Sequence, residues 1–237
     1  MKELMHGIFV FALYLGPLAA VMLLLRRFTR VGNELFRKML HFLFLGAYIP
    51  LLRAFDKWWM LSGFAAALIV IFYPLLLLAD RVPMFSAFVN GRKHGEFKNS
   101  LVLALGVMAV CVTVCWGLMG DKLLVLACIY AWGVGDAFAA LVGKKFGRHK
   151  ITWKYADKHK SVEGSAAMFV TSAVAVLCVL LAHNHLSAIA YVVLPIAGAA
   201  AATVVEMVTK DGRDTVYCPA AAMLVMIPLM ALLGGFV

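Results

Sequence analysis

The charged residue with the clearest chemical potential is Asp136, the single charge in an apolar stretch that predicts a membrane span over 123–143. Ionisable groups inside membrane segments are costly and commonly mark functional sites. Gly135 precedes Asp136, and Asp136, Ala140 and Gly143 share one helix face by their spacing. Small side chains on that face leave room for a packed helix, a cation or a phosphate–metal complex. The structural alternative is an ion pair with a basic residue of a neighbouring helix.

A basic loop follows this span, with seven Lys and Arg residues between 144 and 160. Ser161 is a suitable N-cap for the next predicted helix. Lys158 and Lys160 would then lie beside the free N–H groups and the positive dipole end of that helix. These features predict a phosphate site, whereas the simpler interpretation is a solvated face that sets topology.

Three residues at the edges of this loop support the phosphate interpretation. Gly143 and Gly147 permit close backbone approach. Glu163 lies in the first turn of the next helix, where it either complements the dipole or shares Mg²⁺ with Asp136, because Mg²⁺ is held by carboxylates together with substrate phosphates. The sequence has neither a P-loop nor a dinucleotide-binding glycine motif, so any bound nucleotide is held differently.

Two more clusters could contribute to such a site. Arg37 and Lys38 precede His41 by four and three residues, which places the three side chains close together on one helix. They are either a basic anchor at the membrane edge or charge clamps on a transferring phosphoryl group. The segment 205–219 carries Glu206, Asp211 and Asp214, which form a polar turn or supply further ligands; we count Glu206 and Asp214 as possible additional site residues.

The elements that must position these residues are membrane helices. The chain has 237 residues, of which 64% are hydrophobic and 14% charged, too few charges for a water-exposed surface. We predict an all-α fold, a polytopic integral membrane helical bundle with about eight transmembrane helices in a single membrane domain, 1–237. If the weakest span is re-entrant, seven remain. The predicted spans are 7–25, 35–52, 58–79, 100–119, 123–143, 163–182, 187–208 and 219–236.

The position of the positive charges predicts the orientation. Eighteen of the 22 Lys and Arg residues fall in or beside the connections 26–38, 80–99, 144–162 and 209–218, and the alternate connections are short. Positively charged loops stay in the cytoplasm. We therefore expect a multi-pass protein of a bacterial cytoplasmic membrane, with the basic loops and the active site cytoplasmic and both termini outside.

Four segments in order resemble the polyprenol kinase family, which includes dolichol kinases, phytol kinases and CTP-dependent diacylglycerol kinases. The segments are RKMLH (37–41), GDAFAALVGKKFGRHKI (135–151), KSVEGSAAMF (160–169) and VEMVTKDGRDTVYCP (205–219), and the resemblance covers about 34–220. One departure is that Thr215 follows Asp214 where the family often has Asn.

The resemblance implies an integral membrane kinase that phosphorylates a lipid alcohol, with CTP as donor and Mg²⁺ as cofactor. It implies membrane lipid and nucleotide partners, and no nucleic acid. By this resemblance the family's functional positions fall on Arg37, Lys38, Asp136, Gly143, Lys160, Ser161, Glu163 and Gly164. On the residues alone, we expect Asp136 and Glu163 to hold the metal, and His41, Asp136 and Asp214 remain alternative bases.

Two alternative functions are open at this point. The G-D-x-x-A…G…K-S-x-E-G pattern is also similar to part of the phosphatidate cytidylyltransferases, although their C-terminal signature is absent. A small ion or solute transporter with Asp136 as its ion site is the non-enzymatic alternative. It fits less well because the glycines and basic residues concentrate in one loop instead of several mid-membrane positions.

Overall fold

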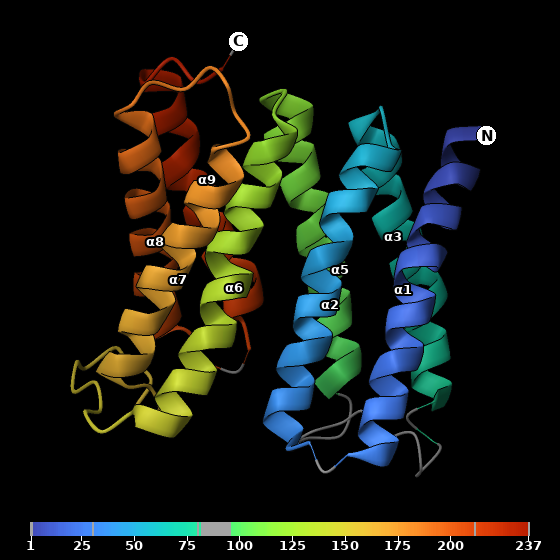
Figure 1. Cartoon of the computed structure of the whole chain (residues 1–237), viewed down its shortest axis with the longest axis horizontal. Helices are drawn as coiled ribbons and strands as arrows, with labels where there is room; N and C mark the ends of the chain where they lie inside the picture. Colours follow the sequence, from blue (N-terminus) through green and yellow to red (C-terminus); the bar gives the residue numbers. More distant parts are fainter. Residues whose placement is uncertain (1, 30, 80, 82–95, 211, 237) are drawn as a thin grey trace. The chain divides into compact units, whose positions relative to one another are not determined.

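The structure is a computed structural model that describes residues 2–29, 31–79, 81, 96–210 and 212–236 (Figure 1). Its long elements are α1 (Lys2–Phe28), α2 (Asn33–Ala54), α3 (Trp58–Ala79), α5 (Glu96–Cys111), the π-helix η1 (Val112–Leu118), α6 (Lys122–Phe146), α7 (Val162–Leu180), α8 (Ala190–Val208) and α9 (Asp214–Leu232). Among the described residues, eight helical segments are long and apolar enough to cross a membrane, with α5 and η1 forming one of them. The predicted all-α polytopic membrane bundle is confirmed.

The span predicted at 35–52 is a continuous helix of 22 residues, α2, and its length and hydropathy suit a full crossing. This outcome favours eight spans over the seven-span alternative. Most of the predicted basic connection 80–99, including Arg92 and Lys93, lies outside the described residues.

The chain divides into two compact units, Met1–Thr113 and Val114–Val237. In the first unit α1 packs on α2, and α3 packs on α5. The turn between α1 and α2 is closed by Arg26, whose guanidinium donates to the Val31 carbonyl at 3.0 Å and to Asn33 Oδ1 at 2.7 Å. Tyr14 Oη donates to the Leu43 carbonyl at 3.1 Å, which ties α1 to α2 at mid-length. The first unit thereby fixes the helix that carries Arg37.

In the second unit α6 is the central helix and packs on α7, α8 and α9. Asp121 begins α6 as its N-cap, with Oδ1 accepting from the backbone N–H groups of Leu123 and Leu124 at 2.8 and 3.0 Å. His183 Nε2 lies 2.9 Å from Asp121 Oδ2. The connections before α6 and after α7 therefore meet at one end of this unit, as the predicted alternation of loops requires.

The contact between α6 and α7 depends on glycine. A Cβ on Gly135 would lie 2.1 Å from Ser172 Oγ, and one on Gly164 would lie 3.0 Å from the Ala139 carbonyl. Gly143 and Gly164 face each other across the same contact, where a Cβ on Gly164 would lie 3.3 Å from the Gly143 Cα. Gly143, one of the small residues predicted on the face of Asp136, thus lies in a close helix–helix contact.

Candidate active site

The basic loop between α6 and α7 folds back on itself and on α8. The backbone N–H of Ile151 donates to the Lys160 carbonyl at 3.2 Å, and that of Val162 donates to the His149 carbonyl at 2.9 Å. The Asp157 N–H donates to the Met207 carbonyl at 2.9 Å. The loop is therefore held at the C-terminal end of α8.

This anchoring brings Lys160 to Glu206. The Lys160 Nζ lies 2.6 Å from Glu206 Oε1 and also donates to the Glu206 backbone carbonyl. Glu206 is only 7% exposed, and its second oxygen, Oε2, is buried with no hydrogen-bond partner among the described residues. A buried ion pair with an unsatisfied oxygen is costly, which points to a further ligand or to a function.

Two more carboxylates lie within electrostatic range of Glu206. They are Asp136 of α6 and Asp214, the first residue of α9. We call Asp136, Lys160, Glu206 and Asp214 the polar cluster. Three helices and the basic loop supply its members, and it holds more carboxylates than ammonium groups. Asp211, which the sequence placed in the same turn, lies outside the described residues.

The polar cluster is suited to a cation that brings further ligands with it. Within the described ranges, no group of three His, Cys, Asp or Glu residues is close enough to hold a metal ion alone. Mg²⁺ is usually held by one or two carboxylates plus waters and substrate phosphates, so such a complete protein cage is not required. The buried Glu206 Oε2 and the neighbouring carboxylates are the oxygen ligands that such a cation prefers.

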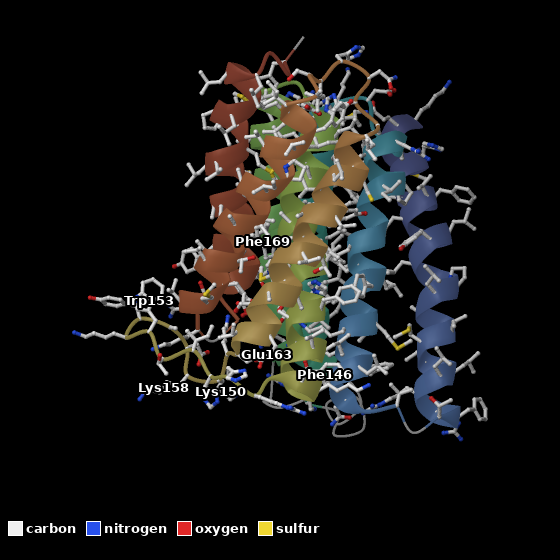
Figure 2. All side chains as sticks on the ribbon, turned by 60° about the vertical axis from the view of Figure 1, so that its left-hand side comes forward. Phe146, Lys150, Trp153, Lys158, Glu163 and Phe169 are labelled. Atoms are coloured by element: carbon white, nitrogen blue, oxygen red, sulfur yellow. The ribbon has the colours of Figure 1, made fainter. Side chains whose placement is uncertain are left out.

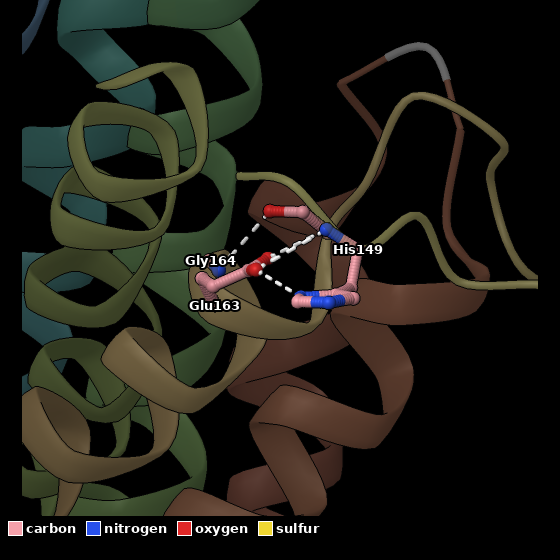
Figure 3. Close-up of polar contacts among 4 residues, drawn as sticks. His149, Glu163 and Gly164 are labelled. Atoms are coloured by element: carbon pink, nitrogen blue, oxygen red, sulfur yellow. Dashed lines mark hydrogen bonds and ion pairs between the residues drawn. The ribbon is translucent and has the colours of Figure 1, made fainter. Parts of the chain in front are cut away.

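Glu163 has a partner of its own (Figure 3). Its carboxylate accepts from the His149 backbone N–H at 3.1 and 3.3 Å, and His149 Nδ1 lies 2.7 Å from Oε1. The contact joins the start of α7 to the first residues of the basic loop. The metal role that the sequence predicted for Glu163 stays a prediction.

The other predicted nucleotide-binding residues lie around the same helix start. Ser161 is the N-cap of α7, with Oγ accepting from the Gly164 N–H at 3.2 Å, as predicted. Gly147 ends α6, and a Cβ there would lie 2.2 Å from the Gly143 carbonyl. Lys158 and Trp153 are exposed on the basic loop (Figure 2). Nucleotide binding by these residues stays a prediction.

The predicted phosphoryl clamp, Arg37, Lys38 and His41, lies in α2 of the first unit. The Arg37 Nη2 pairs with Glu34 Oε1 at 2.6 Å, one turn earlier. Lys38 is 3% exposed and His41 is half-buried. An ammonium buried this deeply in a membrane helix is expensive, which is typical of a functional lysine.

From the sequence, Glu206 was only a possible additional site residue. In the structure it contacts Lys160 directly and is the member around which the polar cluster is defined. The contact with Lys160 joins residues 46 positions apart, which no local spacing reveals. A signal was nevertheless present, because Glu206 is the one charged residue in the predicted span 187–208. The argument that selected Asp136 applies to it equally.

Comparison with known proteins gives one informative similarity. The chain is 27% identical over 222 residues to a phytol kinase of Synechocystis sp. (strain ATCC 27184 / PCC 6803 / Kazusa), which covers 90% of this chain and 87% of that protein. No protein-family model matches the chain, and no solved structure matches it. A match over 90% of the chain includes parts of both units.

Proposed function

We infer that this protein is a membrane kinase of a lipid alcohol, using CTP to phosphorylate the hydroxyl of a phytol, polyprenol, dolichol or diacylglycerol class of lipid. The observation that carries the proposal is the polar cluster, in which Glu206 is buried with Lys160 and lies in range of two more carboxylates. The similarity to a phytol kinase over 90% of the chain supports the same class of reaction.

Phosphoryl transfer asks mainly for positioning and charge neutralisation. A bond forms between the lipid oxygen and the γ-phosphorus, the bond from the γ-phosphorus to the β–γ bridging oxygen breaks, and CDP leaves. Mg²⁺, when bound, neutralises charge on the triphosphate. Asp136 would hold it together with Glu206 or with Glu163, the partner that the sequence predicted.

The remaining residues orient the reactants. Lys160 fixes the Glu206 carboxylate and presents a positive charge beside it. Arg37 and Lys38 neutralise the transferring group, a role that rests on the resemblance of their motif. The hydroxyl proton passes to a base that is one of His41, Asp136 and Asp214. Because helices suited to a membrane carry the cluster, a lipid hydroxyl can reach it laterally.

The test is a phosphoryl-transfer assay of the purified protein in nanodiscs with Mg²⁺. The donors are γ-labelled CTP, ATP, GTP and UTP, and the acceptors are phytol, a polyprenol and diacylglycerol. We expect label transfer to lipid, with CTP preferred, and a loss of at least about 100-fold in Asp136→Asn, the order of a removed transition-state contact. Asp56→Asn is the matched control, because Asp56 is exposed and belongs to the first unit.

The same assay separates the alternatives. Release of CDP with a lipid phosphate identifies a kinase, whereas pyrophosphate and a CDP-lipid, formed from CTP and phosphatidic acid, identify a cytidylyltransferase. Folded Asp136→Asn protein with wild-type activity would remove Asp136 from the mechanism.

A further inference from the structure

A groove of about 770 Å³ opens beside the polar cluster, on another side of the α8 C-terminal end. Its walls come from the basic loop, α8, α9 and the turn that joins the two helices, all in the second unit. The polar part of the lining is Lys154, Tyr155, Thr209, Lys210, Arg213 and Tyr217. No motif of the sequence had singled out this combination, because its residues come from two separate segments.

The groove is positively charged. Lys154, Lys210 and Arg213 have no carboxylate partner within the part of the chain that the structure describes, and Lys154 Nζ lies 5.9 Å from the centre of the Tyr155 ring. By contrast, Lys160 in the neighbouring polar cluster is paired with Glu206. Three cations that line one groove, none of them paired with an acid among the described residues, complement an anion of more than one charge, such as a phosphate monoester.

The rest of the lining is apolar and belongs to helices that are suited to span a membrane. It consists of Val205 and Val208 of α8 and of Ala220, Ala221 and Leu224 of α9. Leu224 is 77% exposed, so this apolar lining continues onto the outer surface of α9. Tyr155 and Tyr217 are exposed and line the same groove, and tyrosine is enriched at membrane interfaces. The groove therefore suits a ligand with an anionic head and a hydrocarbon chain.

We propose that this groove binds a lipid phosphate monoester, with its phosphate on Lys154, Lys210 and Arg213 and its chain along Ala220, Ala221 and Leu224. The ligand is the product class of the reaction proposed above, and its identity as product rests on that function. Glu206 faces the polar cluster while its neighbour Val205 lines the groove, so a single helix separates the two. The groove thus provides a second position for a lipid phosphate after it leaves the cluster.

The test measures binding to the full-length protein in neutral-lipid nanodiscs, without nucleotide or Mg²⁺. The probes are phytyl phosphate, inorganic phosphate and phosphatidylglycerol, which supply a monoester with a chain, a phosphate without a chain and a phosphodiester lipid. We expect phytyl phosphate to bind at least about tenfold more tightly than either of the others.

The variants locate the site. The double variant K210A/R213A removes two cations and should weaken phytyl phosphate binding by at least about tenfold. The control R53A/K57A removes the same charge from exposed positions of the first unit and should bind normally. Ala221→Trp fills the groove without a change of charge and should weaken binding as well; a normal melting temperature shows that each variant is folded.

The proposal is overturned if K210A/R213A and Ala221→Trp bind phytyl phosphate as the wild type does. It is also overturned if inorganic phosphate or phosphatidylglycerol binds as tightly as phytyl phosphate, because neither provides both the monoester and the chain. The kinase proposal fails if no phosphoryl transfer is detected. The binding measurements require no turnover, so they test the groove independently of that result.

Discussion

The Lys160 ammonium group lies 2.6 Å from the Glu206 carboxylate and donates to the backbone carbonyl of the same residue. One side chain of the basic loop therefore contacts both the buried carboxylate of α8 and a backbone carbonyl in the last turn of that helix. The pair fixes the loop over α8 and places a positive charge beside Glu206, which also lies within electrostatic range of Asp136 and Asp214.

Removal of Lys160 should destabilise the protein strongly. Lys160→Ala leaves Glu206 buried without its counter-charge, and breaking one side of a buried pair costs about 3–5 kcal/mol. Thermal unfolding in nanodiscs measures this loss, with Lys158→Ala as the control because Lys158 is exposed. The double variant K160M/E206M should recover most of the stability. Equal melting temperatures for Lys160→Ala and Lys158→Ala would contradict the buried pair.

The glycine contact between α6 and α7 should not tolerate a methyl group. A Cβ at Gly164 meets the Ala139 carbonyl at 3.0 Å, so Gly164→Ala must push the helices apart, at a cost of about 1–3 kcal/mol. Gly106→Ala in α5 is the matched control, because nothing lies within 4 Å of its Cβ. That control should be neutral or stabilising by up to about 1 kcal/mol, since alanine is the better helix former. Denaturation curves in mild detergent that rank the two variants in the reverse order would exclude the contact.

Loss of the N-cap of α7 should lower the free energy of unfolding by a smaller amount. Ser161→Ala removes the acceptor of the Gly164 N–H and should cost about 1 kcal/mol. Ser165→Ala, one turn later, removes a buried hydroxyl that has no hydrogen-bond partner among the described residues, so this change should cost little. Unfolding free energies of the two variants, compared in one detergent, test the cap. A larger loss from Ser165→Ala would show that the cap contributes little.

Magnesium dependence should distinguish the two candidate partners of Asp136. If Glu206 is a metal ligand, Glu206→Gln raises the Mg²⁺ concentration needed for half-maximal activity by about tenfold or more, while Glu163→Gln leaves it unchanged. The reverse pattern would favour Glu163, as the sequence predicted. Magnesium titrations at saturating nucleotide measure both, and a melting curve for each variant confirms that it is folded.

Hydropathy was sufficient to predict the eight spans, because burial of apolar side chains in lipid dominates each of them. The helix ends were harder to predict. α9 begins at Asp214 instead of 219, and α1 begins at Lys2 instead of 7, because hydrogen bonding continues a helix through polar residues that hydropathy excludes. The π-helix η1 had no sequence signal, since it is a local change in hydrogen-bond register.

A residue of the candidate site could be predicted from the sequence where its own type and position were sufficient. Asp136 was selected by its isolation in an apolar span, and Ser161 by its type and position before a helix; the structure confirms the cap and places Asp136 in the polar cluster. The partnership of Lys160 with Glu206 and the groove beside it arise only when α8 and α9 meet the basic loop. Such contacts between distant segments depend on the packing of the helices, which periodicity does not encode.

The order in which the ribosome makes these helices has a consequence for biogenesis. α6 carries Asp136 into the membrane before the rest of the polar cluster is made, and a carboxylate near the centre of an inserting helix costs about 2.5–3.5 kcal/mol. The other members of the polar cluster are synthesised later, the last of them being Asp214 at the start of α9. A nascent chain that ends before α8 therefore lacks two of the three helices that pack on α6 in the second unit. Stable integration of the second unit should be a late, cooperative event, and shortened chains should be targets of membrane quality control.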